Sequence, residues 1–310
     1  MYRFINIKAI PNRAAPAANR PVGRRSKPGR NGSWLAATLF LLPGLAGFAL
    51  FYIWPFIISL GFAFMDRPVG GSFVGFANFA DLLTNRAYLL GLQNTLRFIG
   101  ISVPLNLGLS LGVAMLINKL PRKKELISLF FLIPLVIPSG SMVSFWRGMF
   151  ALDGALNGFL HNFGIERINW LNSDFAMFVM VLIFIWKNLG YNMILYLAGL
   201  SSIPRDYYEA ALVDGSKPRQ TFWYITLPHL MPTTVLALIM SIINSFKVFR
   251  EIFLITGAYP HESIYTLQHF MNNMFTSLNY PRLTTATTIL VAGIAVFTQG
   301  LLWFERKISA

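Results

Sequence analysis

The chain has 310 residues, of which 55% are hydrophobic and only 12% are charged, and its formal net charge is +14. A soluble globular chain carries about 25% charged residues, so this composition excludes an ordinary soluble domain and indicates a polytopic membrane protein. The chain has no cysteine, which excludes disulfide frameworks, iron–sulfur clusters and thiolate chemistry.

The N-terminal segment, residues 1–33, is strongly basic, with eight Lys and Arg residues and no Asp or Glu. It has little apolar surface to bury, which predicts a disordered tail. A basic excess also suits nucleic-acid binding, but the position of these charges directly before an apolar run favours a topology signal. We therefore interpret the segment as a disordered basic tail in the cytoplasm.

Six apolar runs follow, and each is long enough to cross a bilayer as a helix, which takes about 20 residues. Proline interrupts several of them, at Pro134 and Pro138 for example. Membrane helices tolerate such residues because neighbouring groups satisfy the freed backbone. We expect an all-α membrane protein with six transmembrane helices, at Trp34–Ser59, Gln93–Asn118, Leu126–Phe145, Asp174–Gly199, Leu230–Ile255 and Leu283–Phe304.

The loops between these runs alternate in charge. The Lys119–Glu125 turn and the 200–229 segment hold four and three Lys or Arg residues, and the C-terminal tail, residues 306–310, holds two. The other loops hold only one or two each. Cytoplasmic loops are the ones enriched in Lys and Arg, so this asymmetry places both termini and the 200–229 segment in the cytoplasm.

Enzymatic and metal-binding signatures are lacking in the sequence. It contains no phosphate-binding loop of the type Gly-x-x-x-x-Gly-Lys-Ser/Thr, no His-Glu-x-x-His and no Gly-x-Ser-x-Gly. The four histidines are scattered without a second ligand at metal-like spacing, so we expect no metal site and no catalytic residue. The segments outside the spans are too short for an attached globular domain, so fuel hydrolysis and substrate capture must belong to other chains.

The segment from Ser202 to Pro232 predicts two short helices joined by a glycine turn. Pro204 suits the first turn of a helix, and Gly215 suits the position after the last turn, where a positive φ is cheap only for glycine. Pro218 can open a second short helix that runs through Trp223. On composition alone, an ordinary loop between helices remains the alternative.

The order of residues in this segment resembles a known motif. Glu209-Ala210-Ala211-Leu212-Val213-Asp214-Gly215 is similar to the EAA loop of binding-protein-dependent ABC importer permeases. Ser216 and Lys217-Pro218-Arg219 depart from the family's usual residues. The resemblance covers roughly residues 34–305 and is strongest to the sugar-transporting, maltose-type branch, through Ser202-Ile203-Pro204, Phe222, Ile225, Leu227-Pro228, Pro232, Phe246-x-x-Phe249, Thr256-Gly257, Phe76-x-Asn78-Phe79 and Asn94-Thr95.

This resemblance implies a type I ABC importer fold, a permease domain over residues 34–305 and a coupling loop over 201–229. It implies a bacterial inner-membrane protein that works by alternating access with a second permease subunit, favouring a heterodimer. The other implied partners are two ABC ATPase subunits, an outer solute-binding protein, membrane lipid and a carbohydrate, with no nucleic acid. ATP and magnesium would bind to the ATPases, and this chain would bind no cofactor. The implied coupling residues, pressed into a cleft of the ATPase, are Glu209, Ala210, Ala211, Asp214 and Gly215.

Charged residues occur near the middle of two predicted spans, where they are costly and usually face a cavity or a partner. Lys187 lies near the middle of the fourth span, and Lys247, Arg250 and Glu251 lie in the fifth. Lys247 and Glu251 are four residues apart, so they could pair on one helix face. The cations could also pair with a partner subunit or a lipid head group. Alternatively, Lys187 and Lys247 favour an acidic, uronate-containing or heavily hydroxylated sugar.

In the maltose-type branch, sugar contacts come from the fourth and fifth of these spans. Asn188, Ser241, Asn244 and Ser245 could hydrogen-bond hydroxyl groups, and Trp186 and Tyr191 could stack on a sugar face. The substrate-pathway positions that the resemblance implies are Trp186, Lys187, Asn188, Tyr191, Ser241, Asn244, Ser245, Lys247 and Val248.

Three other interpretations compete with a sugar importer subunit. The same fold could carry glycerol phosphate, a polyol or a peptide. A stand-alone channel or secondary transporter would show internal inverted repeats, and no convincing repeat is seen. An intramembrane enzyme would need paired carboxylates, a histidine cluster or a Ser/Lys arrangement, whereas the spans offer only Glu251 and an edge residue, Asp174.

Overall fold

The computed structural model describes residues 30–120 and 124–309, and the part of the predicted basic tail before Arg30 lies outside the described residues. In the described part the chain is helical, with no strand beyond one isolated bridge between Met65 and Phe73. The prediction of an all-α membrane protein is confirmed. Four described helices are long and apolar enough to cross a membrane, or up to six if each of two bent helix pairs counts as one span.

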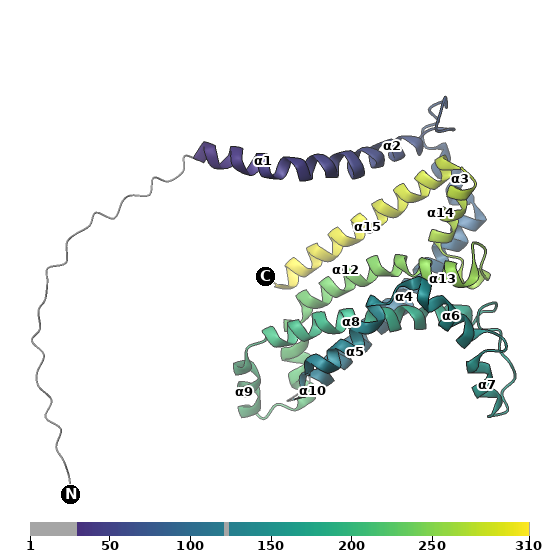
Figure 1. Ribbon diagram of the computed structural model, residues 1–310. Helices are drawn as coiled ribbons and strands as arrows, with labels where there is room; N and C mark the ends of the chain where they lie inside the picture. Colours follow the sequence, from purple (N-terminus) through teal and green to yellow (C-terminus); the bar gives the residue numbers. More distant parts are fainter. Residues whose placement is uncertain (1–29, 121–123, 310) are drawn as a thin grey trace, which may run out of the picture. The chain divides into compact units, whose positions relative to one another are not determined.

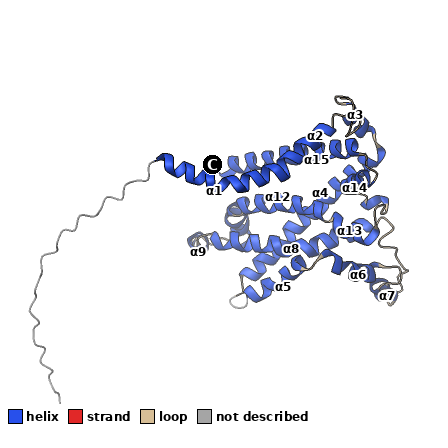
Figure 2. Cartoon of the chain, turned by 45° about the horizontal axis from the view of Figure 1, so that its top comes forward, coloured by secondary structure: helices blue, strands red, loops and turns tan. Residues whose placement is uncertain are grey.

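The chain divides into two units, up to Pro55 and from Phe56 onward. The first contains α1 (Arg30–Phe48) and a π-helical turn (Ala49–Ile53) that leads into α2 (Trp54–Phe62), so a continuous apolar helix covers most of the first predicted span. The second unit is drawn in Figures 1 and 2. Its helices are α3 (Ala77–Thr84), α4 (Arg86–Asn118), α5 (Lys124–Val136), α6 (Ser139–Phe150), α7 (Ala155–His161), α8 (Ala176–Ser202), α9 (Arg205–Val213), α10 (Pro218–Thr221), α11 (Leu227–His229), α12 (Met231–Lys247), α13 (Phe249–Thr256), α14 (Leu267–Thr276) and α15 (Tyr280–Ser309).

The second, fourth and sixth predicted spans are continuous helices, α4, α8 and α15. α4 begins seven residues before the predicted Gln93, because the Asn85 side chain accepts a hydrogen bond from the Tyr88 N–H (3.0 Å) and so caps the helix at Arg86. α15 continues through Ser309, so residues 306–309 form its last turn instead of a separate tail.

The third predicted span, Leu126–Phe145, is not one straight helix. The chain leaves the helix at Ile137, and the helices on the two sides of the break differ in direction by 92°. Pro138 is the cause, since a proline disfavours helical backbone at the residue before it and has no N–H to donate. The third predicted span is therefore a bent pair of helices with Pro138 at the break, which counts as one broken span or as a re-entrant loop.

The fifth predicted span, Leu230–Ile255, is built from α12 and α13, which are separated at Val248. At its other end the chain bends by 66° at Leu230, where the segment Pro218–His229 meets Met231–Thr256. Thus two of the spans are interrupted within the apolar part of the chain.

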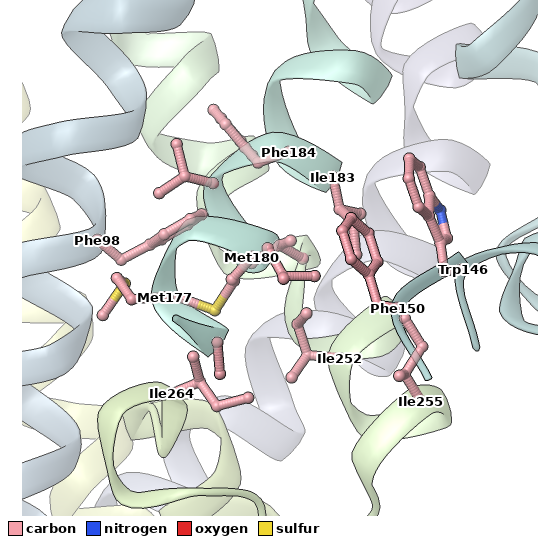
Figure 3. Close-up of a cluster of buried hydrophobic side chains, with 14 of the residues drawn as sticks. Phe98, Trp146, Phe150, Met177, Met180, Ile183, Phe184, Ile252, Ile255 and Ile264 are labelled. Atoms are coloured by element: carbon pink, nitrogen blue, oxygen red, sulfur yellow. The ribbon is translucent and has the colours of Figure 1, made fainter. Parts of the chain in front are cut away.

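The centre of the bundle is α8, which packs against α4, α5 and α12. Phe98 of α4 meets Phe184 of α8 edge to face (ring centroids 5.4 Å apart), and Ile252 of α13 belongs to the same cluster (Figure 3). Gly190 lets α5 approach closely, because a Cβ at this position would collide with the Phe131 carbonyl oxygen.

The two ends of the second unit differ in their contents. α9 lies at one end, and α3, α6, α7 and α14 lie at the other, in both views of the chain (Figures 1 and 2), and Figure 1 shows α10 at the same end as α9. The helices α4, α8, α12 and α15 run between the two ends. This places the predicted coupling loop opposite the loops that are poor in Lys and Arg.

Candidate functional site

The predicted helix–glycine–helix elbow is present. α9 ends at Val213, and Gly215 follows with a φ of +70°. The Gly215 N–H donates to the Leu212 carbonyl (3.1 Å), and the Ser216 N–H donates to the Ala211 carbonyl (2.9 Å). This pair of bonds is the Schellman motif, which satisfies the last carbonyls of a helix and requires a positive φ at the glycine.

The second helix of the elbow differs from its predicted extent. α10 starts at Pro218, and the Lys217 N–H donates to the Gln220 side chain (2.8 Å), which fixes this start. The helix does not end at Trp223; it passes through a π-helical turn, Phe222–Thr226, into α11. The Tyr208 and Thr226 hydroxyls are 3.2 Å apart and tie α9 to this turn.

Most of the predicted coupling residues face away from the chain. Glu209, Ala210, Asp214 and Gly215 are exposed, whereas Ala211 is only 7% exposed and packs within the elbow. Two apolar residues that the sequence interpretation did not single out, Leu212 and Val213, are 75% and 88% exposed. The sequence did contain a signal for these two residues, because an apolar pair in a polar loop is unusual unless another surface covers it.

A cavity of about 130 Å³ opens where α5, α6, α8, α12 and α13 meet. Both interrupted spans reach it: Leu135 and Ser139 flank one break, and Lys247, Val248 and Arg250 flank the other. The complete lining is Leu135, Ser139, Ile183, Phe184, Lys187, Asn188, Asn244, Lys247, Val248, Arg250 and Glu251.

An ion pair lies in the wall of this cavity. The Lys187 ammonium donates to Glu251 Oε1 and to the Ser139 hydroxyl (2.9 Å), and that hydroxyl donates to the same carboxylate oxygen (2.7 Å). Glu251 is only 4% exposed. The charge of Lys187 is therefore balanced inside the chain by a carboxylate on α13, and its ammonium group also donates a hydrogen bond to a hydroxyl at the start of α6.

The expected pairing of Lys247 with Glu251 does not occur. The Lys247 ammonium donates to the Asn244 side chain (2.9 Å), and both Lys247 and Arg250 are exposed. The Glu251 carboxylate instead accepts hydrogen bonds from Lys187 of α8 and Ser139 of α6. Among the described residues, neither Lys247 nor Arg250 has a carboxylate within 4.0 Å.

The remaining predicted pathway residues separate into two groups. Trp186 packs edge to face on Trp146 (5.3 Å between ring centroids), and Tyr191 is half-buried. Ser241 accepts a hydrogen bond from the Asn192 side chain (2.7 Å), and Ser245 donates to the Ile242 carbonyl (2.6 Å). Both serines are buried and do not line the cavity, so this conformation brings together five of the nine predicted positions: Lys187, Asn188, Asn244, Lys247 and Val248.

No metal-binding group is found in the described part of the chain, where no three His, Asp or Glu side chains gather. His269 of α14 is fully buried, and its Nδ1 accepts a hydrogen bond from the Thr266 N–H (3.2 Å). Desolvation lowers the pKa of His269 to about 4, so the ring is neutral at physiological pH. Its role in this position is to cap α14.

Known proteins are similar to this chain in sequence and fold. Residues 106–310 match the family described as binding-protein-dependent transport system inner membrane component. The lactose transport system permease protein LacF of Rhizobium radiobacter is 31% identical over 280 residues, covering 87% of this chain and 94% of LacF. The sn-glycerol-3-phosphate transport system permease protein UgpA of Yersinia enterocolitica is 32% identical over 247 residues, covering 78% of this chain and 83% of UgpA.

Among solved structures, a chain of a bacterial ABC transporter involved in the import of the acidic polysaccharide alginate superposes with a TM-score of 0.78 and 23% identity. The match covers 90% of this chain and 98% of that one. This similarity confirms the fold of type I ABC importer permeases. With the family match over two thirds of its length, the chain belongs to the inner-membrane components of binding-protein-dependent transport systems.

Proposed function

We propose that this protein is a permease subunit of an ATP-driven importer for a sugar or oligosaccharide. The chain supplies half of a translocation pathway that alternates between outward-facing and inward-facing states. It performs no chemistry itself, and ATP with magnesium is hydrolysed on two separate ATPase subunits. A sister permease, favoured to be a different chain, completes the pathway, and an outer solute-binding protein delivers the sugar.

The observation that carries this proposal is the elbow formed by α9, Gly215 and α10. A tight glycine-dependent turn presents Glu209, Leu212 and Val213 to the surroundings at one end of the bundle. An exposed apolar pair beside a carboxylate suits a docking surface that becomes buried in a pocket of a partner protein. Glu209 pairs with a basic residue of the ATPase, and this end of the bundle, with both chain termini, lies in the cytoplasm.

Carbohydrate is the cargo that the cavity and the relatives favour together. The cavity offers amide groups of Asn188 and Asn244, which suit the hydroxyl groups of a sugar. Glycerol phosphate is the second candidate, because UgpA carries that name and is about as similar as LacF. A polyol or a peptide remains a variant of the same fold with other cargo.

Purification and uptake test the proposal together. The tagged chain should retain an ATPase and a sister permease, and right-side-out vesicles should accumulate sugar when loaded with ATP and not without it. Val213→Asp should leave the protein in the membrane but lower ATP-driven uptake at least ten-fold, because it places a charge in the pocket of the partner protein. Val69→Asp is the matched control, since Val69 is 87% exposed in the loop after α2.

Several results would contradict the proposal. A channel or an intramembrane enzyme would copurify with no ATPase. Uptake at the full rate without ATP would indicate a stand-alone transporter. Equal losses in the Val213→Asp and Val69→Asp variants would remove the elbow as the coupling surface.

A further inference from the structure

We propose that the cavity between the two interrupted spans binds the anionic group of the cargo, a carboxylate or a phosphate, through Lys247 and Arg250. Lys187, held by Glu251, is a positioning residue and does not bind the cargo. This inference rests on the proposed function, since it names the chemical class of what that permease carries.

The argument begins with the charges that line the cavity. They are three cations, Lys187, Lys247 and Arg250, and one carboxylate, Glu251. The ion pair between Lys187 and Glu251 cancels one positive and one negative charge. The Ser139 hydroxyl accepts a further hydrogen bond from the Lys187 ammonium. The lining therefore keeps two positive charges from Lys247 and Arg250, for which the described residues provide no carboxylate.

The second step is the backbone around these two cations. They stand on the two sides of Val248, which itself lines the cavity and keeps helical dihedral angles, and the 92° break at Pro138 reaches the same space through Ser139. Interrupted helices at membrane depth are tolerated where they line a cavity, and transporters place their binding sites at such breaks. The break of the third span thus opens onto the space that holds the surplus charge.

The third step is the position of the cations along the predicted spans. Lys247 is the last residue of α12 and lies eight residues before the end of the fifth predicted span at Ile255. Lys187 is the twelfth of the 27 residues of α8. A lipid phosphate lies at the surface of the bilayer, outside the hydrocarbon region. The position of both cations inside predicted spans therefore favours a dissolved anion that enters the pathway over a lipid head group.

The fourth step is size and chemistry. A volume of about 130 Å³ accommodates an acidic group with part of a sugar ring, as a bulk water occupies about 30 Å³. Arg250 can hold two oxygens of a carboxylate or phosphate in parallel, and Lys247 adds a point charge. The amides of Asn188 and Asn244 lie in the same lining for neighbouring hydroxyl groups.

The test uses the complete importer, with both permeases and both ATPases, in lipid nanodiscs. Two pairs of radiolabelled probes differ mainly in charge: trigalacturonate against galactotriose, and sn-glycerol 3-phosphate against glycerol. Equilibrium binding is measured for the wild type, Lys247→Gln, Arg250→Gln and the double variant. Lys247→Arg and Arg250→Lys keep the charge, and Arg67→Gln removes an exposed cation outside the cavity.

We expect the wild type to bind one anionic probe more tightly than its neutral counterpart, and the pair that shows this preference identifies carboxylate or phosphate. The double variant should lose roughly 10- to 100-fold in affinity for that anionic probe and less than about two-fold for the neutral one, as expected for charge-assisted hydrogen bonds. Lys247→Arg and Arg67→Gln should stay near the wild type, and Arg250→Lys should fall between the wild type and Arg250→Gln, because lysine keeps the charge but not the parallel pair of hydrogen bonds. Added salt should weaken binding of the anionic probe only in proteins that keep the cations.

Four outcomes would overturn the inference. These are no preference of the wild type for either anionic probe, equal losses for charged and neutral probes, loss of the sister permease from the purified double variant, and loss of bound anionic lipid from that variant without any effect on the probes. The last two would assign the cations to the partner subunit or to lipid. ATP-driven uptake of galactotriose by the double variant at the wild-type rate would leave the proposed function standing while the inference fails. No ATP-driven uptake of any carbohydrate by the wild type would remove the proposed function itself.

Discussion

Lys187 of α8 and Glu251 of α13 form an ion pair inside the membrane-spanning bundle, and the Ser139 hydroxyl at the start of α6 bonds to both. Because these three side chains come from three helices, their hydrogen bonds hold the broken part of the third span against the fourth and fifth spans. The geometry also decides the roles of the intramembrane cations, since only Lys187 has its countercharge within the described chain.

Removing one member of this pair should be more damaging than removing both. Lys187→Met or Glu251→Gln leaves a buried group without its partner, which costs roughly 3 kcal/mol, whereas the double change should cost clearly less than the two singles together. Thermal unfolding of the purified subunit in detergent measures this cycle. Additive losses would show that the two side chains are not coupled, and Lys124→Met, on an exposed lysine, is the control.

Replacement of Gly190 should loosen the contact between α5 and α8. In Gly190→Ala the new Cβ meets the Phe131 carbonyl, so the backbones must move apart at a cost of about 2 kcal/mol. Gly112→Ala in α4 is the matched control, because a Cβ there meets nothing within 4 Å. The two variants should differ in melting temperature, and identical values would contradict the close approach.

The turn at Gly215 should be needed for coupling and not for insertion. Gly215→Pro cannot adopt a φ of +70°, so it should disrupt the elbow and abolish ATP-driven uptake while membrane expression persists. Gly215→Asn should retain most uptake, since asparagine tolerates this conformation. Uptake and expression measured side by side check the prediction, and full uptake by the proline variant would contradict it. A bulky residue at Ala211 should also lower uptake, through the packing of the elbow itself.

Acid should destabilise the end of the bundle that contains α14. The pKa of His269 is lowered from 6.5 to about 4 by burial, so the folded state binds fewer protons than the unfolded state between these values. Stability is therefore fully present above pH 6.5 and falls as the pH drops toward 4, by up to about 3 kcal/mol. Unfolding measured from pH 7 to 4 should show this slope. His269→Gln should flatten it, and an unchanged slope would exclude His269 as its cause.

The sequence was sufficient for the parts of the fold that local rules determine. The lengths of the apolar runs predicted α4, α8 and α15, and the preference of glycine for a positive φ after a helix predicted the turn at Gly215. Pro138 was visible, but proline is tolerated in some membrane helices and breaks others, and only the surrounding packing decides between these outcomes. The same limit applies to Glu251: spacing offered Lys247 as its partner, whereas the tertiary arrangement brought Lys187 to it from 64 residues away.

The cavity lining shows a similar division. Five of the positions that the resemblance implied line the cavity, whereas Ser139 comes from a different span and Arg250 was not among the implied positions. Ser241 and Ser245 have suitable chemistry, but their hydrogen bonds inside the bundle occupy them in this conformation.

The uninterrupted course of α8 has a mechanical consequence. This helix contains no proline. Its part from Lys187 to Ser202 connects the cavity wall to the elbow, which begins two residues later at Pro204. The distance along it is about 22 Å, so a swing of about 5° at one end shifts the other by about 2 Å, comparable to the length of a hydrogen bond. In the proposed mechanism, α8 would transmit a displacement of the elbow directly to Lys187 in the cavity wall, without a relay of intermediate side chains.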